Sequence, residues 1–542
     1  MARSTQQQRN PARRLPFPLF EDEDESMSCS FSSLPTASTP QLPSNHFLAQ
    51  RPVTPPPAAP PLRSALPDTS SLAAADFDVS VETGFLPPQE PVQSLEELGN
   101  GWREMEECLQ AAVKEVEGIP GGGVGKMSES FRQRVRLLPT ADTSLLTTLP
   151  LLRRAHTLLA HLAHFYMHSS FPSQTVVPRS LSIPLVYTSE KLGVPPILTY
   201  ADTVLWVWKF IDPSKPLRAD NVDISTTFTS SSSERAFFLL SLFCELYGPT
   251  ILRLMSSTLD ETFFSDQVAL TRISSYLYSI SHLIDELKNL MHNAVKGNFG
   301  PATNEQTIIP STFYWEIRPW FNGGKWVYER VGEDGEDVEM EWGGPSAGQS
   351  SLVHAIDLFL GVDHAPRHTP STPSSSSTPT STAATSPHES KSKSGLTDST
   401  FMQRMSTYMP HHHRSFLQHL TSIHSPSSSS PLPSLRSLTL EHPSILSPAY
   451  DAAVLSMKRF RDTHIILATH FIVAQARHPP SPESVHFAEW ETKRLMKEQE
   501  EEVRKREGHE KKKEVVVGTG GTDLSSFLKL CRDRTKEALI EQ

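Results

Sequence analysis

The residues with the clearest chemical potential lie in an apolar segment near the C-terminus. If this segment is helical, Phe460, His464, Leu467 and Phe471 fall at i, i+4, i+7 and i+11, on one face. One imidazole then sits in an apolar stripe, where an unpaired polar group is costly. A haem iron would satisfy it, because haem iron is commonly held by a proximal histidine. A backbone carbonyl is the commoner partner, so this helix alone favours a core histidine.

Three other segments set polar groups among apolar ones. Arg318 lies among Phe, Tyr and Trp residues, where a guanidinium can clamp a carboxylate in bidentate fashion. Phe237, Ser241 and Glu245 recur every four residues, which places one hydroxyl and one carboxylate on a largely apolar helix face. The glycine-rich run that begins at Gly343 leads into a helix, whose start offers free N–H groups to an anion.

Several other patterns have weaker chemical content. His161, His164 and His168 share a helix face without a cysteine or carboxylate, which favours core packing over a metal site. His411–His413 are consecutive and point about 100° apart in a helix, so they cannot converge on one ion. Gly518–Asp523 lacks the Lys-Ser/Thr ending of a P-loop and predicts a mobile loop before a helix. The common hydrolase motifs Gly-x-Ser-x-Gly and His-Glu-x-x-His do not occur.

The composition bears on the class of protein. The chain has 542 residues and a formal net charge of −11, which argues against a nucleic-acid-binding surface. Its four cysteines lie far apart, without metal-type spacing or a disulfide framework. No apolar run approaches the roughly 20 residues that span a bilayer, and the N-terminus lacks the apolar segment of a signal peptide. These features predict a cytoplasmic protein that binds neither nucleic acid nor membrane.

Low-complexity and charged segments interrupt the ordered part. Residues 1–75 are crowded with Pro, Ser, Gln and Thr and predict a disordered tail. The Ser/Thr/Pro-rich stretches at 365–400 and 425–434 predict insertions in loops. Residues 489–513 carry Glu and Lys or Arg pairs at i, i+4, which predicts a solvated helix.

Helical periodicity dominates the remainder, and no series of alternating strands is present. The capping-box pattern of Ser231–Glu234 introduces a helix through Leu254. Residues 178–196 are punctuated by prolines and predict an irregular connector. Further helices are predicted at 94–116, 144–168, 200–210, 266–295, 352–360, 450–477 and 524–540. The fold class is therefore all-α.

Taken in order along the chain, several stretches closely resemble the indoleamine 2,3-dioxygenase family, the haem enzymes that open the indole ring of tryptophan. These stretches are Phe77–Pro88, Pro195–Leu205, Phe237–Ser241, Ile317–Pro319, Gly344–Gly361, Tyr408–Leu417, the helix of His464 and Gly518–Leu528. The resemblance implies two lobes. A small helical domain with its connector would occupy 76–198, and a large haem-binding catalytic domain would occupy 199–542.

The resemblance also implies roles for individual residues. His464 falls on the proximal ligand of haem b, and Arg461 with Asp357 falls on a charged pair beside it. Arg318 falls on the arginine that holds the substrate carboxylate, and Ser241 on a distal hydroxyl; these two are the expected catalytic residues. Substrate contacts are implied for Tyr200, Thr203, Phe237, Phe313, Ser346, Ala347 and Thr519, and cofactor contacts for Gly344 and Ser346.

The chain departs from the family pattern at a few positions. Pro345 is inserted in the Gly-Gly-Ser-Ala run. Thr203 stands where animal relatives often have cysteine, and Asn322 where they have serine. Neither the change at Thr203 nor that at Asn322 removes a group that the chemistry requires, whereas the insertion of Pro345 leaves the register of the run and its backbone donors open. The loop insertions are longer than in compact relatives, and surface loops tolerate such length.

The implied activity is the insertion of both atoms of O₂ across the indole C2–C3 bond of L-tryptophan, which gives N-formyl-L-kynurenine. This is the first step of the kynurenine route towards NAD. The implied partners are L-tryptophan and other indoleamines, O₂ and an electron donor that keeps the iron ferrous, with the protein a monomer. The alternatives are a haem-binding sensor with little turnover and a helical scaffold without haem. Retention of Arg318 favours the enzyme, because a sensor has no need of a carboxylate clamp.

Overall fold

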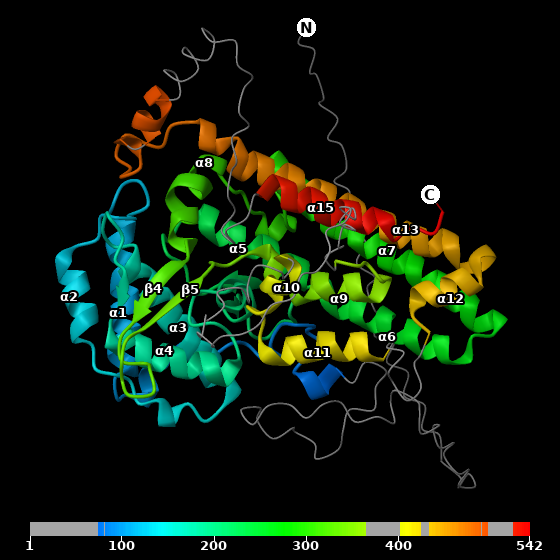
Figure 1. Ribbon diagram of the computed structural model, residues 1–542, viewed down its shortest axis with the longest axis horizontal. Coiled ribbons are helices and arrows are strands. Elements are labelled where there is room, and N and C mark those ends of the chain that lie inside the picture. Colours follow the sequence, from blue (N-terminus) through cyan, green and yellow to red (C-terminus); the bar gives the residue numbers. More distant parts are fainter. Residues whose placement is uncertain are drawn as a thin grey trace, which may run out of the picture. The chain divides into compact units, whose positions relative to one another are not determined.

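Long α-helices make up most of the computed structural model, which describes residues 74–80, 82–364, 401–423, 433–488, 490–496 and 524–541 (Figure 1). The α-helices are α1 (Trp102–Glu117), α2 (Glu129–Leu137), α3 (Leu149–Met167), α4 (Arg179–Leu192), α5 (Ser232–Glu245), α6 (Gly248–Phe264), α7 (Gln267–Lys296), α8 (Pro310–Thr312), α9 (Ser351–Leu360), α10 (Phe401–Ser406), α11 (His411–Ser422), α12 (Leu435–Glu441), α13 (Pro443–Ala468) and α15 (Leu524–Glu537). All of these residues belong to one contact unit, Pro43–Gln542.

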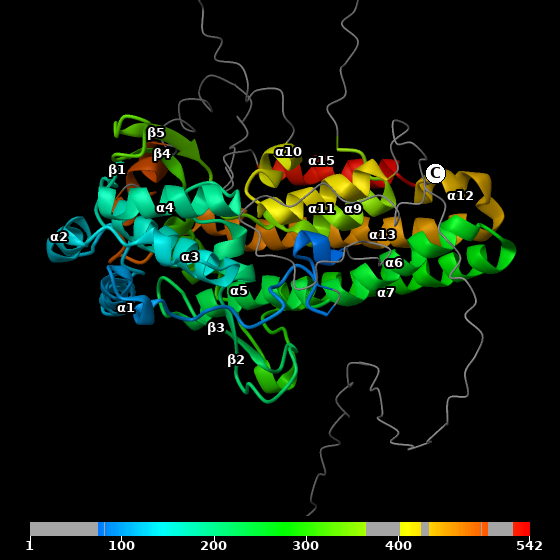
Figure 2. The ribbon, with the colours of Figure 1, turned by 90° about the horizontal axis from the view of Figure 1, so that it is seen from below.

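The longest helices pack side by side. α13 lies against both α7 and α15, and α6 lies against α7 (Figures 1 and 2). The Asp266 carboxylate caps the start of α7, because it accepts hydrogen bonds from the N–H groups of Val268 and Ala269. The buried face of α7 repeats every three or four residues, as an amphipathic helix requires; it comprises Leu270, Ile273, Leu277, Ile280, Ile284 and Leu287. The helix predicted at 266–295 is confirmed.

A second hydrophobic cluster forms around α3, which is buried along almost its whole length. α1, α4 and the 3₁₀ turn η8 (Arg318–Phe321) pack against α3. Aromatic rings fill the space between them: Phe228 stacks on Trp320 at a centroid distance of 5.6 Å, and Phe165 meets Trp320 edge-on at 5.1 Å. This cluster connects the N-terminal helices to the segment that carries Arg318.

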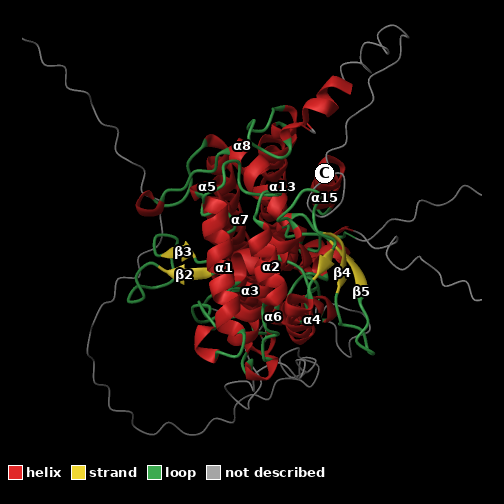
Figure 3. Cartoon of the chain, turned by 90° about the vertical axis from the view of Figure 1, so that its left-hand side faces the viewer, coloured by secondary structure: helices red, strands yellow, loops and turns green. Residues whose placement is uncertain are grey.

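Two small sheets accompany the helices and lie on opposite sides of them (Figure 3). Strand β1 (Val176–Val177) pairs in parallel with β4 (Gly324–Tyr328), and β4 pairs antiparallel with β5 (Val338–Trp342). Strands β2 (Trp208–Phe210) and β3 (Val222–Ile224) form an antiparallel pair. The predicted helical fold class is confirmed, with these short strands added to it.

The prediction of an irregular connector at 178–196 is wrong over most of its length, because α4 occupies Arg179–Leu192. Pro178 stands at the N-cap, where its missing N–H costs nothing. Pro184 lies inside the helix and removes one hydrogen bond, yet Leu181 and Leu185 are fully buried around it. Burial of that apolar face outweighs the loss of one backbone hydrogen bond.

The stretch Ser232–Phe264 is long and apolar enough to cross a membrane by length and composition alone. In the structure it is two helices, α5 and α6, which separate at Leu246 and Tyr247. The buried side chains of α5 include two carboxylic residues, Glu234 and Glu245. Burial against neighbouring helices accounts for the apolar composition of this stretch without a bilayer.

Some predictions fall outside the described residues. They are the tail up to residue 73, the insertion at 365–400, most of the insertion at 425–434, and the glycine-rich loop with Thr519. Of the charged segment at 489–513, only residues 490–496 are described, and they are helical. The boundary between two lobes at residues 198 and 199 stays a prediction.

Candidate functional site

The helices enclose a cavity of about 250 Å³ whose lining is mostly apolar. It lies among α5, α7, α9, α13, α15 and the turns between them. Residues from distant parts of the chain meet there, among them these members of the predicted site: Tyr200, Thr203, Phe237, Ser241, Phe313, Arg318, Ser346, Ala347, Arg461 and His464. The sequence-based site is therefore assembled at one place, while the roles of its members stay predictions.

Three π-helical turns of the described chain contribute to this lining. They are η5 (Ala201–Leu205), η7 (Phe313–Ile317) and η10 (Thr469–Val473). Each places a lining residue on the cavity: Thr203, Phe313 and Phe471, respectively. A π-turn inserts a residue into the helical register and often marks a functional site. Sequence periodicity cannot find such turns, since they arise from tertiary packing.

His464 lies on α13 with its side chain on the cavity. Within the described part of the chain, neither of its ring nitrogens has a hydrogen-bond partner. Burial, assisted by the positive charge of Arg461, lowers the pKa of His464 to about 4. The imidazole is therefore neutral at physiological pH, the form that binds a metal. The commoner alternative, a core histidine satisfied by a backbone carbonyl, is not what the structure contains.

Behind His464, a buried charged network joins α13, α9 and α15. Arg461 donates to Asp357 and to the hydroxyl of Thr535, and His364 Nε2 lies 2.9 Å from the same Asp357 oxygen. Burial opposes ionisation of Asp357, but the charge of Arg461 and the hydrogen bond from His364 outweigh it and lower its pKa to about 2. Asp357 does not itself line the cavity; it holds Arg461, which does.

Aromatic rings and one guanidinium form another wall. Phe237 of α5 lies 4.4 Å from Phe313 between ring centroids, and Phe313 meets Phe471 edge-on at 6.0 Å. The Arg318 guanidinium lies 5.4 Å from the centre of the Tyr314 ring. Burial lowers the pKa of Arg318, yet arginine stays charged in proteins. The wall therefore offers an anion a cation beside flat apolar surfaces.

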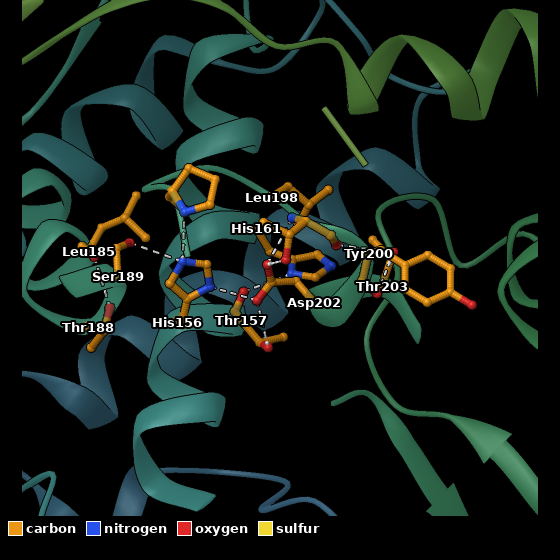
Figure 4. Close-up of polar contacts among 12 residues, drawn as sticks. His156, Thr157, His161, Leu185, Thr188, Ser189, Leu198, Tyr200, Asp202 and Thr203 are labelled. Atoms are coloured by element: carbon orange, nitrogen blue, oxygen red, sulfur yellow. Dashed lines mark hydrogen bonds and ion pairs between the residues drawn. The ribbon is translucent and has the colours of Figure 1, made fainter. Parts of the chain in front are cut away.

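The wall that carries Tyr200 and Thr203 is anchored from behind by Asp202 (Figure 4). One Asp202 oxygen accepts from His156 Nδ1 at 2.7 Å and from the Thr157 hydroxyl at 3.1 Å. The other oxygen accepts from the N–H and the hydroxyl of Thr199, at 2.9 Å and 2.7 Å. Burial alone would raise the pKa of Asp202, but its interaction with His156 lowers it below the usual value. Sequence reasoning missed this pair.

The glycine-rich loop packs closely against the backbone at Phe321, so that no residue with a Cβ atom fits at Gly344. A Cβ there would lie 1.7 Å from the Phe321 carbonyl oxygen. Gln349 ties this loop to the opposite turn, because its amide donates to the Gly344 carbonyl at 3.0 Å and accepts from the Tyr200 N–H at 2.8 Å. The inserted Pro345 itself lines the cavity, whereas Gly344 does not.

The histidines of α3 are in the core, as predicted from their sequence pattern. His161 Nδ1 lies 2.7 Å from the Thr157 carbonyl oxygen, His164 Nδ1 lies 2.7 Å from that of Trp320, and His168 Nε2 lies 2.8 Å from that of Asn322. A second cavity-lining imidazole, His354 of α9, was not predicted. Its Nε2 lies 3.0 Å from the Gly348 carbonyl oxygen, so that it has the backbone partner that His464 lacks.

Comparisons with known proteins identify a family that the chain matches over most of its length. The family model described as "Indoleamine 2,3-dioxygenase" matches residues 73–538. The chain is 29% identical over 408 residues to indoleamine 2,3-dioxygenase of Saccharomyces cerevisiae, which covers 73% of this chain and 80% of that protein. It is 27% identical to indoleamine 2,3-dioxygenase 1 of Rattus norvegicus, over 86% of this chain and 95% of the relative. It is 25% identical to 6-hydroxytryptophan 2,3-dioxygenase of Fusarium equiseti, over 85% of this chain and 97% of that relative.

Replacing His464 tests its predicted role as a metal ligand. H464A is expected to lose haem during purification, because no other cavity-lining imidazole of the described chain lacks a partner. H354A is the matched control and is expected to retain haem, since His354 already contacts a carbonyl. The ratio of Soret to protein absorbance measures both. A normal haem spectrum in H464A would refute the assignment.

Replacing Asp202 tests the buried anchor. D202N puts an amide where two carboxylate oxygens accept from four donors, and should lower the free energy of unfolding by about 3 kcal/mol. The pKa of Asp202 is lower in the folded protein than its usual value of 3.8. Its contribution to the stability of the fold is therefore present above pH 3.8 and is lost as the pH falls through the folded pKa. The difference in free energy of unfolding between the wild type and D202N, measured by urea titration, should become smaller at acid pH. D212N, in an exposed turn, is the control and should change stability far less than D202N.

Proposed function

This chain belongs to the indoleamine 2,3-dioxygenase family, and on that basis we propose that it is a haem-dependent enzyme that cleaves the indole ring of L-tryptophan. Both atoms of O₂ enter across the C2–C3 bond, and the product is N-formyl-L-kynurenine, at the head of the kynurenine route towards NAD. The observation that supports this most is the shared cavity, where the unpaired imidazole of His464 and the guanidinium of Arg318 meet aromatic walls.

The residues around His464 fit a resident haem b. The neutral imidazole of His464, which has no protein partner in the described chain, would hold the haem iron, and the apolar residues beside it suit a porphyrin. Arg461, fixed by Asp357 and Thr535, adds a positive charge next to that nitrogen and limits movement of α13. When bound, haem supplies the redox-active iron that dioxygen chemistry needs, kept ferrous by an external electron donor.

The other walls bind and orient the substrate in this proposal. Arg318 binds the tryptophan carboxylate, since a guanidinium pairs with a carboxylate through two hydrogen bonds. Phe237 and Phe313 pack against the indole, and their apolar surfaces keep water away from it. Fixing both ends of the substrate confines the C2–C3 bond to one position, which lowers the entropic part of the barrier.

The cavity wall around the aromatic rings offers few side chains that could transfer a proton. Among the described lining residues at Tyr200 and in η5, α5, η7 and η8, the polar groups are the Tyr200 phenol, the hydroxyls of Thr203 and Ser241, the Cys244 thiol and the Arg318 guanidinium. Thr203 donates back to the Thr199 carbonyl at 3.3 Å. This part of the wall contains no imidazole or carboxylate among the described residues, so the proposed reaction does not rely on a strong side-chain base here to remove the indole N–H proton.

The substrate is proposed to be L-tryptophan itself, although one relative is named for 6-hydroxytryptophan. A ring hydroxyl needs a polar partner when buried, and Phe237, Phe313 and Phe471 offer none. Decarboxylated indoleamines such as tryptamine lack the carboxylate that Arg318 would bind, so they should be poorer substrates. The proposal includes a cytoplasmic monomer; the cysteines of the described chain, Cys108, Cys244 and Cys531, are free thiols.

The direct test uses reconstituted protein with ascorbate, methylene blue and L-tryptophan, and follows the absorbance of formylkynurenine. Parallel reactions contain 6-hydroxytryptophan, tryptamine or no substrate. A larger amount of product from L-tryptophan than from the parallel reactions supports the proposal. Haem incorporation without turnover of any of these substrates would instead favour the haem-binding sensor. Protein without a Soret band would contradict both the enzyme and the sensor.

Arg318 provides a sharper test of substrate binding. R318K keeps a positive charge but loses the planar fork, so kcat/KM for L-tryptophan should fall by about 100-fold while the haem spectrum is unchanged. Tryptamine, which has no carboxylate, should be affected by less than about threefold. R272K, on the surface of α7, is the control and should match the wild type. Equal losses for both substrates would contradict a carboxylate clamp.

A further inference from the structure

A buried carboxyl group lies directly behind two walls of the cavity. Glu245 is the last residue of α5, one turn after Ser241, and it is 1% exposed. Its Oε1 accepts a hydrogen bond from the Tyr200 hydroxyl at 2.9 Å and another from the Ser350 hydroxyl at 2.7 Å. Tyr200 and Ser350 both line the cavity, whereas Glu245 does not. One oxygen atom therefore connects the turn of Tyr200 to the start of α9.

The second oxygen of Glu245 is unusual. Oε2 is buried and has no hydrogen-bond partner in the described part of the chain. The titratable groups that face the carboxyl are Tyr200, just before η5, and Cys244 of α5. The start of α9 contributes only the Ser350 hydroxyl. Among the described residues, no basic side chain pairs with Glu245. A buried carboxylate without a cation is costly, so a purely structural role would be served better by an amide.

We propose that Glu245 is a positioning residue of the substrate cavity, which holds Tyr200 and Ser350 in place most firmly when its carboxyl group is ionised. This inference rests on the proposed function, because the cavity is taken as the tryptophan site. The amide of Gln349 makes a parallel connection between Tyr200 and Gly344. Glu245 and Gln349 thus join the same two walls at different points.

The ionisation of Glu245 falls in the neutral range. Burial raises its pKa to about 7, although the hydrogen bonds from Ser350 and Tyr200 oppose that rise. Above this pKa the carboxylate accepts charge-assisted hydrogen bonds, which are shorter and stronger than those of a neutral acid. Below it, both bonds weaken and the Tyr200 ring gains freedom. KM for L-tryptophan should therefore fall as pH rises through about 7, while kcat changes little.

The first experiment measures KM and kcat of the haem-loaded enzyme from one pH unit below this pKa to one unit above it. The wild type should show a decrease in KM of about fivefold across this range. E245Q should show a KM near the acidic value of the wild type and no dependence on pH. E234Q is the matched control, because Glu234 is also a buried carboxyl of α5 with a raised pKa. Its oxygens accept hydrogen bonds from the backbone N–H groups of Phe228 and Thr229, away from the cavity.

A second readout does not depend on turnover. Infrared difference spectra of protein with and without haem should contain a band from a protonated carboxyl group that titrates near neutral pH. The band should be absent from E245Q and present in E234Q. In Y200F the carboxyl loses one donor, so the midpoint should move upward.

The outcomes separate the two proposals. If the wild type produces no formylkynurenine but the infrared band titrates as expected, the proposed function fails and the neutral titration of Glu245 stands. If turnover is normal but E245Q keeps the pH dependence of KM, or the band persists in E245Q, the positioning role is overturned. A pH dependence lost equally in E234Q would also overturn it.

Discussion

A neutral imidazole in an apolar wall, without a protein group to satisfy it, is the constraint on which the rest of this site depends. Burial of an unpaired polar group is unfavourable, and the neighbouring His354 avoids that cost through a backbone carbonyl. His464 does not, and its lowered pKa leaves a neutral nitrogen on the cavity. In the proposed enzyme, coordination of the haem iron would recover the lost interaction, so a bound haem would contribute to stability as well as chemistry.

The charged groups that fix the cavity lie mostly behind its surface. Asp202 with His156, Asp357 with Arg461, and Glu245 with Tyr200 each hold an element that carries lining residues. A low local dielectric strengthens such hydrogen bonds, provided that every partner is in place. The lining is largely apolar, while electrostatic interactions one layer outward fix the elements that carry it. This separation lets an oxygen-dependent site be both rigid and poor in side-chain bases.

Sequence reasoning succeeded where the information is local or carried by motifs. The amphipathic pattern of α7 defined that helix to within a residue or two. Tyr200, Phe237, Phe313, Arg318 and His464, which the family resemblance pointed to, all line one cavity in the structure, while their roles stay predictions. It failed where tertiary packing overrides local preference: α4 continues through Pro184, and π-turns form where lining side chains must be re-aimed. Asp202 and His156 are 46 positions apart, and nothing local signals their pairing.

The proposed function requires a bond between a nitrogen of His464 and the haem iron. The most direct measurement is the resonance Raman spectrum of the ferrous, ligand-free protein, prepared with natural histidine and with ¹⁵N-labelled histidine. The account predicts an iron–imidazole stretching band that shifts with the label. An iron centre whose spectrum is insensitive to the label, or one with the signature of a thiolate ligand, would contradict it.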